Sequence, residues 1–144
     1  MIKKAETEDA GALAELAVQM WTDSDPDELS REFRELVQSD EAACFIKYAD
    51  GRPIAFAQCQ LRHDYVEGTD SSPVGYLEGI FVSEGYRRHG VAAELLAACE
   101  KWAGGKDCTE FASDCELDNE DSLHFHMAAG FEEANRIICF RKEL

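Results

Sequence analysis

The sequence has few basic residues. It contains 14 lysines and arginines against 30 aspartates and glutamates, a formal net charge of −16. Such a surface repels nucleic acid and anionic membranes, so we predict that neither is a partner and that a cationic ligand is favoured. Acidity that serves only solubility would give the same composition. The 144 residues, 45% of them hydrophobic, suit one compact core, and we predict a single domain over residues 1–144.

Long apolar runs and paired cysteine motifs are also missing. The first residues, MIKKAETEDA, contain no apolar stretch of the kind found in signal peptides, and no segment approaches the ~18 apolar residues of a membrane span. We therefore expect a cytoplasmic protein whose six cysteines are reduced and mostly buried. No CxxC pair occurs, and the spacing of His124 and His126 does not bring two side chains together on a helix, so no metal site is expected.

The periodicity of the apolar residues predicts a mixture of strands and helices. We expect a short strand over residues 2–5, followed by a helix that ends near Trp21. Asp25-Pro26-Asp27-Glu28 joins a capping carboxylate to a proline in the first helical turn, which predicts a second helix. Extended runs on both sides of Asp50-Gly51 predict a hairpin, and VGYLEGIFV, residues 74–82, predicts a longer strand.

The stretch VSEGYRRHGVAAEL follows that strand and places two arginines and a histidine before Gly90 and a helical repeat. A helix N-terminus exposes unpaired N–H groups, and a glycine lets the backbone approach a bound anion. The patterns GxxxxGK[ST] and GxGxxG after a strand are both absent, so the familiar nucleotide folds are not indicated. By itself the stretch fits either a phosphate site or an ordinary helix start with incidental arginines.

The same stretch resembles the hallmark of the GCN5-related N-acetyltransferases (GNAT), Gln/Arg-x-x-Gly-x-Gly/Ala after a long strand, here RRHGVA at residues 87–92. The later segment DNEDSLHFHMAAGF resembles the family's Asn-containing helix with its terminal Gly-Phe. The chain is similar above all to aminoglycoside 6'-N-acetyltransferases, in which YLEGIFV, the RRxGVA loop, CTEFASD and LDN occur together. The resemblance covers nearly the whole chain and implies an α/β (α+β) GNAT fold: a mixed, mostly antiparallel sheet of six to seven strands, split at its central strand and flanked by about four helices.

The resemblance also implies a function, namely transfer of an acetyl group from acetyl-CoA to the 6'-amine of an aminoglycoside antibiotic, which confers resistance, by an enzyme that is often a homodimer. The C-terminal segment NRIICF is expected to be a strand with apolar surface for such pairing. Positions that match coenzyme contacts in the family are Ile80, Phe81, Val82, Arg87, Arg88, His89, Gly90, Val91, Ala92, Ala93 and Asn119. Positions that match aminoglycoside contacts are Trp21, Tyr65, Glu78, Asp114 and Asn135, the last of which is an acid in relatives. Trp21 and Tyr65 would equally fit ordinary packing.

The chemistry of acetyl transfer assigns three candidate catalytic groups. Only a neutral amine attacks a thioester, so Glu78, an acid in an apolar strand, is the candidate base with Asp114 as its partner; a solvated strand residue is the alternative. A bulge near Gly79 would present the backbone N–H of Ile80 or Phe81 to the oxyanion. His126 stands where the resemblance places a thiolate-protonating tyrosine, although a helix-surface histidine is the alternative.

Two other functions remain open from the sequence. One is an acetyltransferase that acts on a polyamine or a protein amine, and the other is a non-catalytic acyl-CoA-binding sensor. Consumption of aminoglycosides in the presence of acetyl-CoA would distinguish the aminoglycoside acetyltransferase hypothesis from both alternatives.

Overall fold

The computed structural model describes residues 1–144, and five strands of this chain form one sheet in the order β1-β2-β3-β4-β5. The strands are β1 (Ile2–Lys4), β2 (Ala42–Ala49), β3 (Arg52–Arg62), β4 (Val74–Val82) and β5 (Phe111–Ser113). The first four are antiparallel to their neighbours, and β5 is parallel to β4. The β2–β3 turn confirms the predicted hairpin, because Asp50 and Gly51 both have the positive φ angles, 51° and 76°, of a tight hairpin turn.

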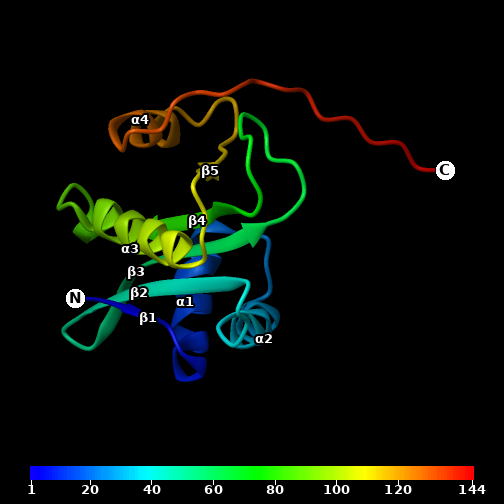
Figure 1. Ribbon diagram of the computed structural model, residues 1–144. Coiled ribbons are helices and arrows are strands. Elements are labelled where there is room, and N and C mark those ends of the chain that lie inside the picture. The colour runs from blue at the N-terminus through cyan, green and yellow to red at the C-terminus, as the bar shows by residue number, and fades with distance from the viewer.

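Helices cover both faces of the sheet (Figure 1). They are α1 (Ala10–Met20), α2 (Pro26–Leu36), α3 (Val91–Gly105) and α4 (Glu120–Ala128), with short 3₁₀ turns at Thr7–Asp9 and Glu84–Tyr86. The start of α2 is the predicted one, because Asp25 accepts a hydrogen bond from the backbone N–H of Glu28 at 3.2 Å. The four helices and the mixed sheet confirm the predicted fold class.

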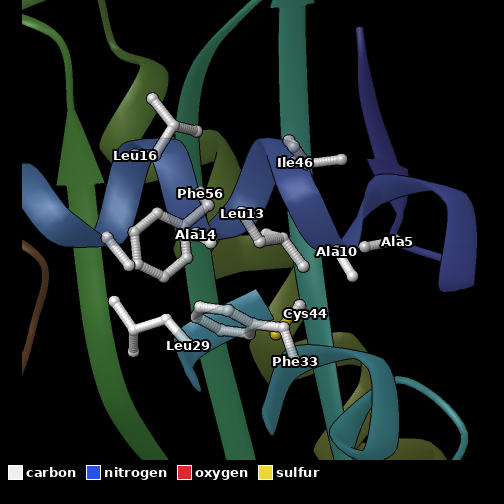
Figure 2. Packing of buried hydrophobic residues seen from close by; sticks show 11 residues of the cluster. Ala5, Ala10, Leu13, Ala14, Leu16, Leu29, Phe33, Cys44, Ile46 and Phe56 are labelled. Atoms are coloured by element: carbon white, nitrogen blue, oxygen red, sulfur yellow. The ribbon is translucent and has the colours of Figure 1, made fainter. Parts of the chain in front are cut away.

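The core consists of two layers, one on each side of the sheet. On one side, α1 and α2 pack on β2 and β3, and the rings of Phe33 and Phe56 lie edge to face with centroids 5.9 Å apart (Figure 2). On the other side, Leu95, Leu96 and Cys99 of α3 pack on the central strands. The central strands therefore lie between two apolar layers.

The cysteines meet the expectation in part. Cys44, Cys59 and Cys99 are buried free thiols in the core, and burial raises the pKa of Cys44 well above its ordinary value. Cys115 and Cys139 are also free but exposed, so packing does not explain them.

The sheet is split as predicted, but it has fewer strands than predicted. β5 pairs with β4 only at Gly75–Leu77, so from Glu78 onward β4 has no neighbour on that side. The expectation of six to seven strands was wrong for this chain. The segment NRIICF forms no strand because no other segment lies beside it to complete a ladder, and the C-terminal residues run away from the body (Figure 1).

Two further features concern ligands and membranes. No helix has both the length and the apolar character that a membrane crossing requires. No group of three or more histidine, cysteine, aspartate or glutamate side chains is arranged to hold a metal ion.

Candidate active site

A β-bulge places Glu78 at the point where the sheet splits. Gln58 pairs with Gly79 and the next residue of β3, Cys59, pairs with Leu77, so Glu78 is the extra residue without a partner. The predicted bulge near Gly79 is therefore confirmed. Gly79 also allows the close approach of Trp21, since a Cβ at Gly79 would lie 2.9 Å from Cζ2 of that ring. Trp21, which also contacts Phe56 edge to face, thus lies directly beside the bulge.

The carboxylate of Glu78 is held by an arginine. Nε and Nη2 of Arg62 donate to its two oxygens at 3.0 and 2.9 Å. This hydrogen bonding raises the pKa of Arg62 further above its ordinary value. The guanidinium also lies 3.5 Å from the centroid of the Tyr76 ring, a cation–π contact. Glu78 is therefore a fixed group on the strand and not a freely solvated one.

Tyr76 links this pair to Asp114. Its phenolic O–H donates a hydrogen bond to Oδ2 of Asp114, the residue that follows β5. Burial and this bond to a carboxylate raise the pKa of Tyr76 well above its ordinary value, so the hydroxyl stays protonated. The structure thus connects the two predicted acids, Glu78 and Asp114, through Arg62 and Tyr76.

His126 lies on the other side of the split. Its Nδ1 is 2.7 Å from the carbonyl of Ser122, one turn earlier in α4, and its Nε2 is 2.8 Å from Oγ of Ser113. A carbonyl accepts only, so we assign the proton of the neutral ring to Nδ1, and Nε2 then accepts from the serine hydroxyl. Ser113 pairs with Leu77, the residue before Glu78. His126 is therefore a half-buried residue anchored at the split, not a solvated helix-surface histidine.

The loop between β4 and α3 ends in an uncapped helix N-terminus. Arg88 and Gly90 have positive φ angles of 65° and 79°, and no side chain caps α3. The N–H groups of the first turn therefore point out of the helix toward any bound anion. Arg87 turns back, because its Nε donates to the carbonyl of Val82 at 2.8 Å and its guanidinium faces the Phe81 ring. Arg88 and His89 are exposed.

Three residues of β4 at positions where we expected coenzyme contacts lie along the edge of the strand that has no neighbour. Ile80, Phe81 and Val82 hydrogen-bond with β3 on one side only, since the pairing with β5 has ended. Backbone N–H and C=O groups on the other side are thus available to an extended ligand, as in the addition of a strand to a sheet edge. This edge leads directly from Glu78 to the N-terminus of α3. Asn119 lies apart and caps α4 by accepting from the N–H of Ser122.

Tyr65 and Asn135 form a separate, exposed rim. Tyr65, whose side chain is 75% exposed, lies on the β3–β4 loop and accepts from the N–H of Gly68. Asn135 donates to Glu67 of the same loop at 2.7 Å. The structure brings these two predicted residues to one loop but records no contact from either to Glu78.

An acidic groove runs along α2. One cavity of about 420 Å³ lies between α2 and β3, lined by Glu32, Glu35, Leu36, Ser39, Glu41, Ala42, Gln60 and Leu61. A second, of about 310 Å³, continues past Glu32 to the start of the helix and is lined by Asp23, Ser24, Asp25, Glu28, Leu29 and Glu32. The groove adds negative charge next to the strand that ends in Arg62.

The comparison with known proteins identifies the family. The sequence pattern of the Acetyltransferase (GNAT) family matches residues 10–131. The chain belongs to this family. The aminoglycoside N(6')-acetyltransferase type 1 of Salmonella typhimurium is 46% identical over 127 residues, which is 88% of each chain. The enzyme of the same name from Serratia marcescens is 39% identical over 145 residues, covering 100% of this chain and 99% of the relative.

Solved structures agree with this GNAT assignment. AAC(6')-Iy in complex with the bisubstrate analog CoA-S-monomethyl-acetylneamine matches with a TM-score of 0.95 at 42% identity, covering 100% of this chain and 98% of that chain. The GNAT fold expected from the motifs is therefore confirmed, and the match covers the full length of this chain.

Sequence reasoning missed several residues of this GNAT site. Arg62 lies in none of the motifs, whereas Tyr76 and Ser113 lie within YLEGIFV and CTEFASD but had no role assigned to them. All three acquire their place only through the pairing of β4 with β3 and β5. The one available signal was that Tyr76 and Glu78 are two apart in a strand and thus share a face.

Proposed function

We propose that the protein transfers the acetyl group of acetyl-CoA directly to the 6'-amine of an aminoglycoside antibiotic and thereby confers resistance. The observation that carries the proposal is the carboxylate of Glu78 on the bulge, at one end of an open strand edge whose other end meets an uncapped helix N-terminus. A cation site and an anion site thus lie along one strand. The relatives named above carry this activity in their names.

Glu78 acts as the base. Its negative charge attracts the ammonium of the acceptor, and it takes one proton from that group, directly or through one water, so that the neutral amine attacks the thioester carbonyl. The new C–N bond forms as the carbonyl oxygen becomes an oxyanion, and the attacking nitrogen, now positively charged, loses a second proton to water as the amide forms. Asp114 supports the same acceptor as a second carboxylate near the strand.

Acetyl-CoA is held along the open edge and at the helix N-terminus. The N–H groups at Gly90, Val91, Ala92 and Ala93 receive the pyrophosphate, with Arg88 and His89 exposed beside them. Ile80, Phe81 and Val82 pair with the pantetheine arm, and the N–H of Ile80 or Phe81 donates to the oxyanion. Asn119 contacts the coenzyme from the start of α4.

His126 supplies the proton for the departing thiolate. When the C–S bond breaks, the oxyanion returns to a carbonyl, and the imidazolium form of His126, in which Nε2 also carries a proton, gives that proton to Ser113, whose hydroxyl proton passes to the thiolate sulfur. His126 then regains a proton from water. Trp21, Tyr65 and Asn135 line the acceptor side, and the acids of the α2 groove increase the attraction for a polycation.

A substrate panel with acetyl-CoA tests the function. We expect release of CoA with aminoglycosides that carry a 6'-amine and none with matched compounds that carry a 6'-hydroxyl. Equal rates on both would reject the regiochemistry, and turnover only with polyamines or protein amines would replace the substrate class. E78Q should lower kcat/KM by about 10²–10⁴-fold while CoA affinity stays constant. A wild-type protein that binds CoA but turns over no amine would instead be a sensor.

We propose in addition that the protein is a homodimer joined through its C-terminal segment. Ile137, Ile138 and Phe140 are 65, 79 and 90% exposed, although three such side chains within four residues normally avoid water. The outer edge of β5 lies unpaired at the end of the sheet. A strand from a second copy would cover both the apolar side chains and the open edge.

Sedimentation of the full chain tests the dimer. I138E should convert a dimer into a folded monomer, because the side chain makes no buried contact within its own copy. The unfolding temperature of wild type, but not that of I138E, should rise with protein concentration. L117E, at an exposed leucine outside the C-terminal segment, is the control and should remain dimeric. A monomeric wild-type protein at micromolar concentration would refute the proposal.

We also propose a cytoplasmic location, supported by six free cysteines, three of them buried in the core. Acetyltransferase activity found in the periplasmic and not in the cytoplasmic fraction of producing cells would contradict it.

A further inference from the structure

Arg62, at the end of β3, already holds the carboxylate that the proposed function assigns to the incoming amine. Its two donors engage both oxygens of Glu78, at 3.0 and 2.9 Å. An ammonium that binds Glu78 needs the same oxygens and the same negative charge. The protein therefore carries its own cation in the place that the acceptor amine would use.

This pair differs from an ordinary surface ion pair. The side chain of Glu78 is only 18% exposed and that of Arg62 39%, and a two-pronged guanidinium–carboxylate contact fixes the orientation of both groups. Exposed pairs between flexible side chains contribute little, but here the Tyr76 ring supports the guanidinium from one face at 3.5 Å. That second contact does not involve Glu78. The guanidinium thus keeps a place on the ring when the carboxylate binds something else.

We infer that Arg62 is an internal competitor for the amine site and determines specificity for polycationic acceptors. The inference rests on the proposed role of Glu78. An acceptor with a single amine exchanges one ion pair at Glu78 for another, so it gains little by displacing Arg62. An acceptor with several ammonium groups has further cations for Asp114, which Tyr76 joins to the Arg62–Glu78 pair, and these added contacts offset the loss of the internal pair.

The test compares two acceptors that present the same amine on the same kind of ring. Kanamycin is the polycation, and methyl 6-amino-6-deoxyglucoside carries the single amine. R62M removes the guanidinium and retains most of the side-chain length. We expect R62M to raise kcat/KM for the monoamine relative to kanamycin by about tenfold, the size of one charge-assisted contact. R62K keeps a point charge without the two-pronged contact, so its ratio should lie between those of R62M and wild type.

R52M is the matched control, because Arg52 is exposed at the opposite end of the same strand and its loss changes the net charge equally. It should leave the ratio unchanged. If kcat/KM fell equally for both acceptors in R62M, Arg62 would only orient Glu78. If the ratio of the two kcat/KM values equalled that of wild type without such a fall, Arg62 would not compete with the amine. Either result overturns the inference.

A binding measurement separates this inference from the proposed function. If wild type transfers no acetyl group to kanamycin, the function is wrong whatever the variants do. Calorimetry of kanamycin with the CoA-bound protein needs no turnover. R62M should bind kanamycin at least as tightly as wild type, and weaker binding would contradict competition.

Discussion

The substitution G79A tests whether the close contact between the bulge and Trp21 shapes the site. The backbone at Gly79 does not require a positive φ, so the effect of an added methyl group is purely steric. The new Cβ would lie 2.9 and 3.2 Å from Cζ2 and Cη2 of Trp21 and 3.1 Å from Cε of Met20. Real Cβ contacts are longer, so the indole must move away from the strand that carries Glu78.

The expected cost follows from overpacking. An extra methyl group in a close-packed site costs typically about 1–3 kcal/mol, which for a chain of this length lowers Tm by roughly 3–10 °C. Since Trp21 is also packed against Phe56, its displacement disturbs the side of the bulge on which we propose that the acceptor binds. We expect kcat/KM for the aminoglycoside to fall by a larger factor than KM for acetyl-CoA changes, because the added methyl group faces Trp21 and Met20 and not the unpaired edge of β4.

Thermal unfolding, steady-state kinetics and tryptophan fluorescence form the assay. The chain has two tryptophans, so the W102F background isolates the emission of Trp21. G11A is the matched control, because a Cβ there meets nothing within 4 Å and an alanine in α1 should stabilise by up to about 1 kcal/mol. A G79A protein with the stability and Trp21 emission of its parent would refute the steric reasoning.

Three other expectations concern the loops and a helix start. Hydrogen bonds from Ser71 and from the N–H of Asp70 hold the pKa of Glu110 below its ordinary 4.5 and tie the β3–β4 loop to this carboxylate. The hydrogen bonds are complete above pH 4.5 and are lost as the pH falls through the lowered pKa. Proteolysis of the loop should therefore accelerate in acid, and E110Q should be cleaved fast already at neutral pH. D25A removes the cap of α2 and should cost about 0.5–2 kcal/mol in urea unfolding, whereas D25S should restore most of it. G90A imposes a left-handed conformation on alanine at a cost of about 1–2 kcal/mol. We expect KM for acetyl-CoA to rise roughly tenfold while KM for the aminoglycoside stays unchanged. An unchanged KM for acetyl-CoA would mean that this loop does not bind the coenzyme.

Several elements could be predicted because their signals are local. The proline and carboxylates at Asp25-Pro26 act within one helical turn, and Asp50-Gly51 meets the dihedral demands of a two-residue turn. Gly90 ends the loop in a conformation that favours glycine and starts α3. The order of the elements and the position of the uncapped helix N-terminus followed from these short-range effects.

The hydrogen-bond partner of Glu78 could be found only from the tertiary structure. An acid in an apolar strand was visible in the sequence, but its partner Arg62 lies 16 residues away and meets it only because β3 and β4 pair with a one-residue slip. The link from His126 to Ser113 likewise depends on the docking of α4 against β5.

The number of strands also depended on the tertiary structure. The apolar pattern of NRIICF is typical of a strand, but a strand exists only where another segment supplies its hydrogen-bonding partners, and within this chain none does. By itself the sequence determined the helices, the strands before the C-terminal segment and the family that they build. Only the tertiary structure decided which charges meet, because register and packing bring together residues that no local pattern connects.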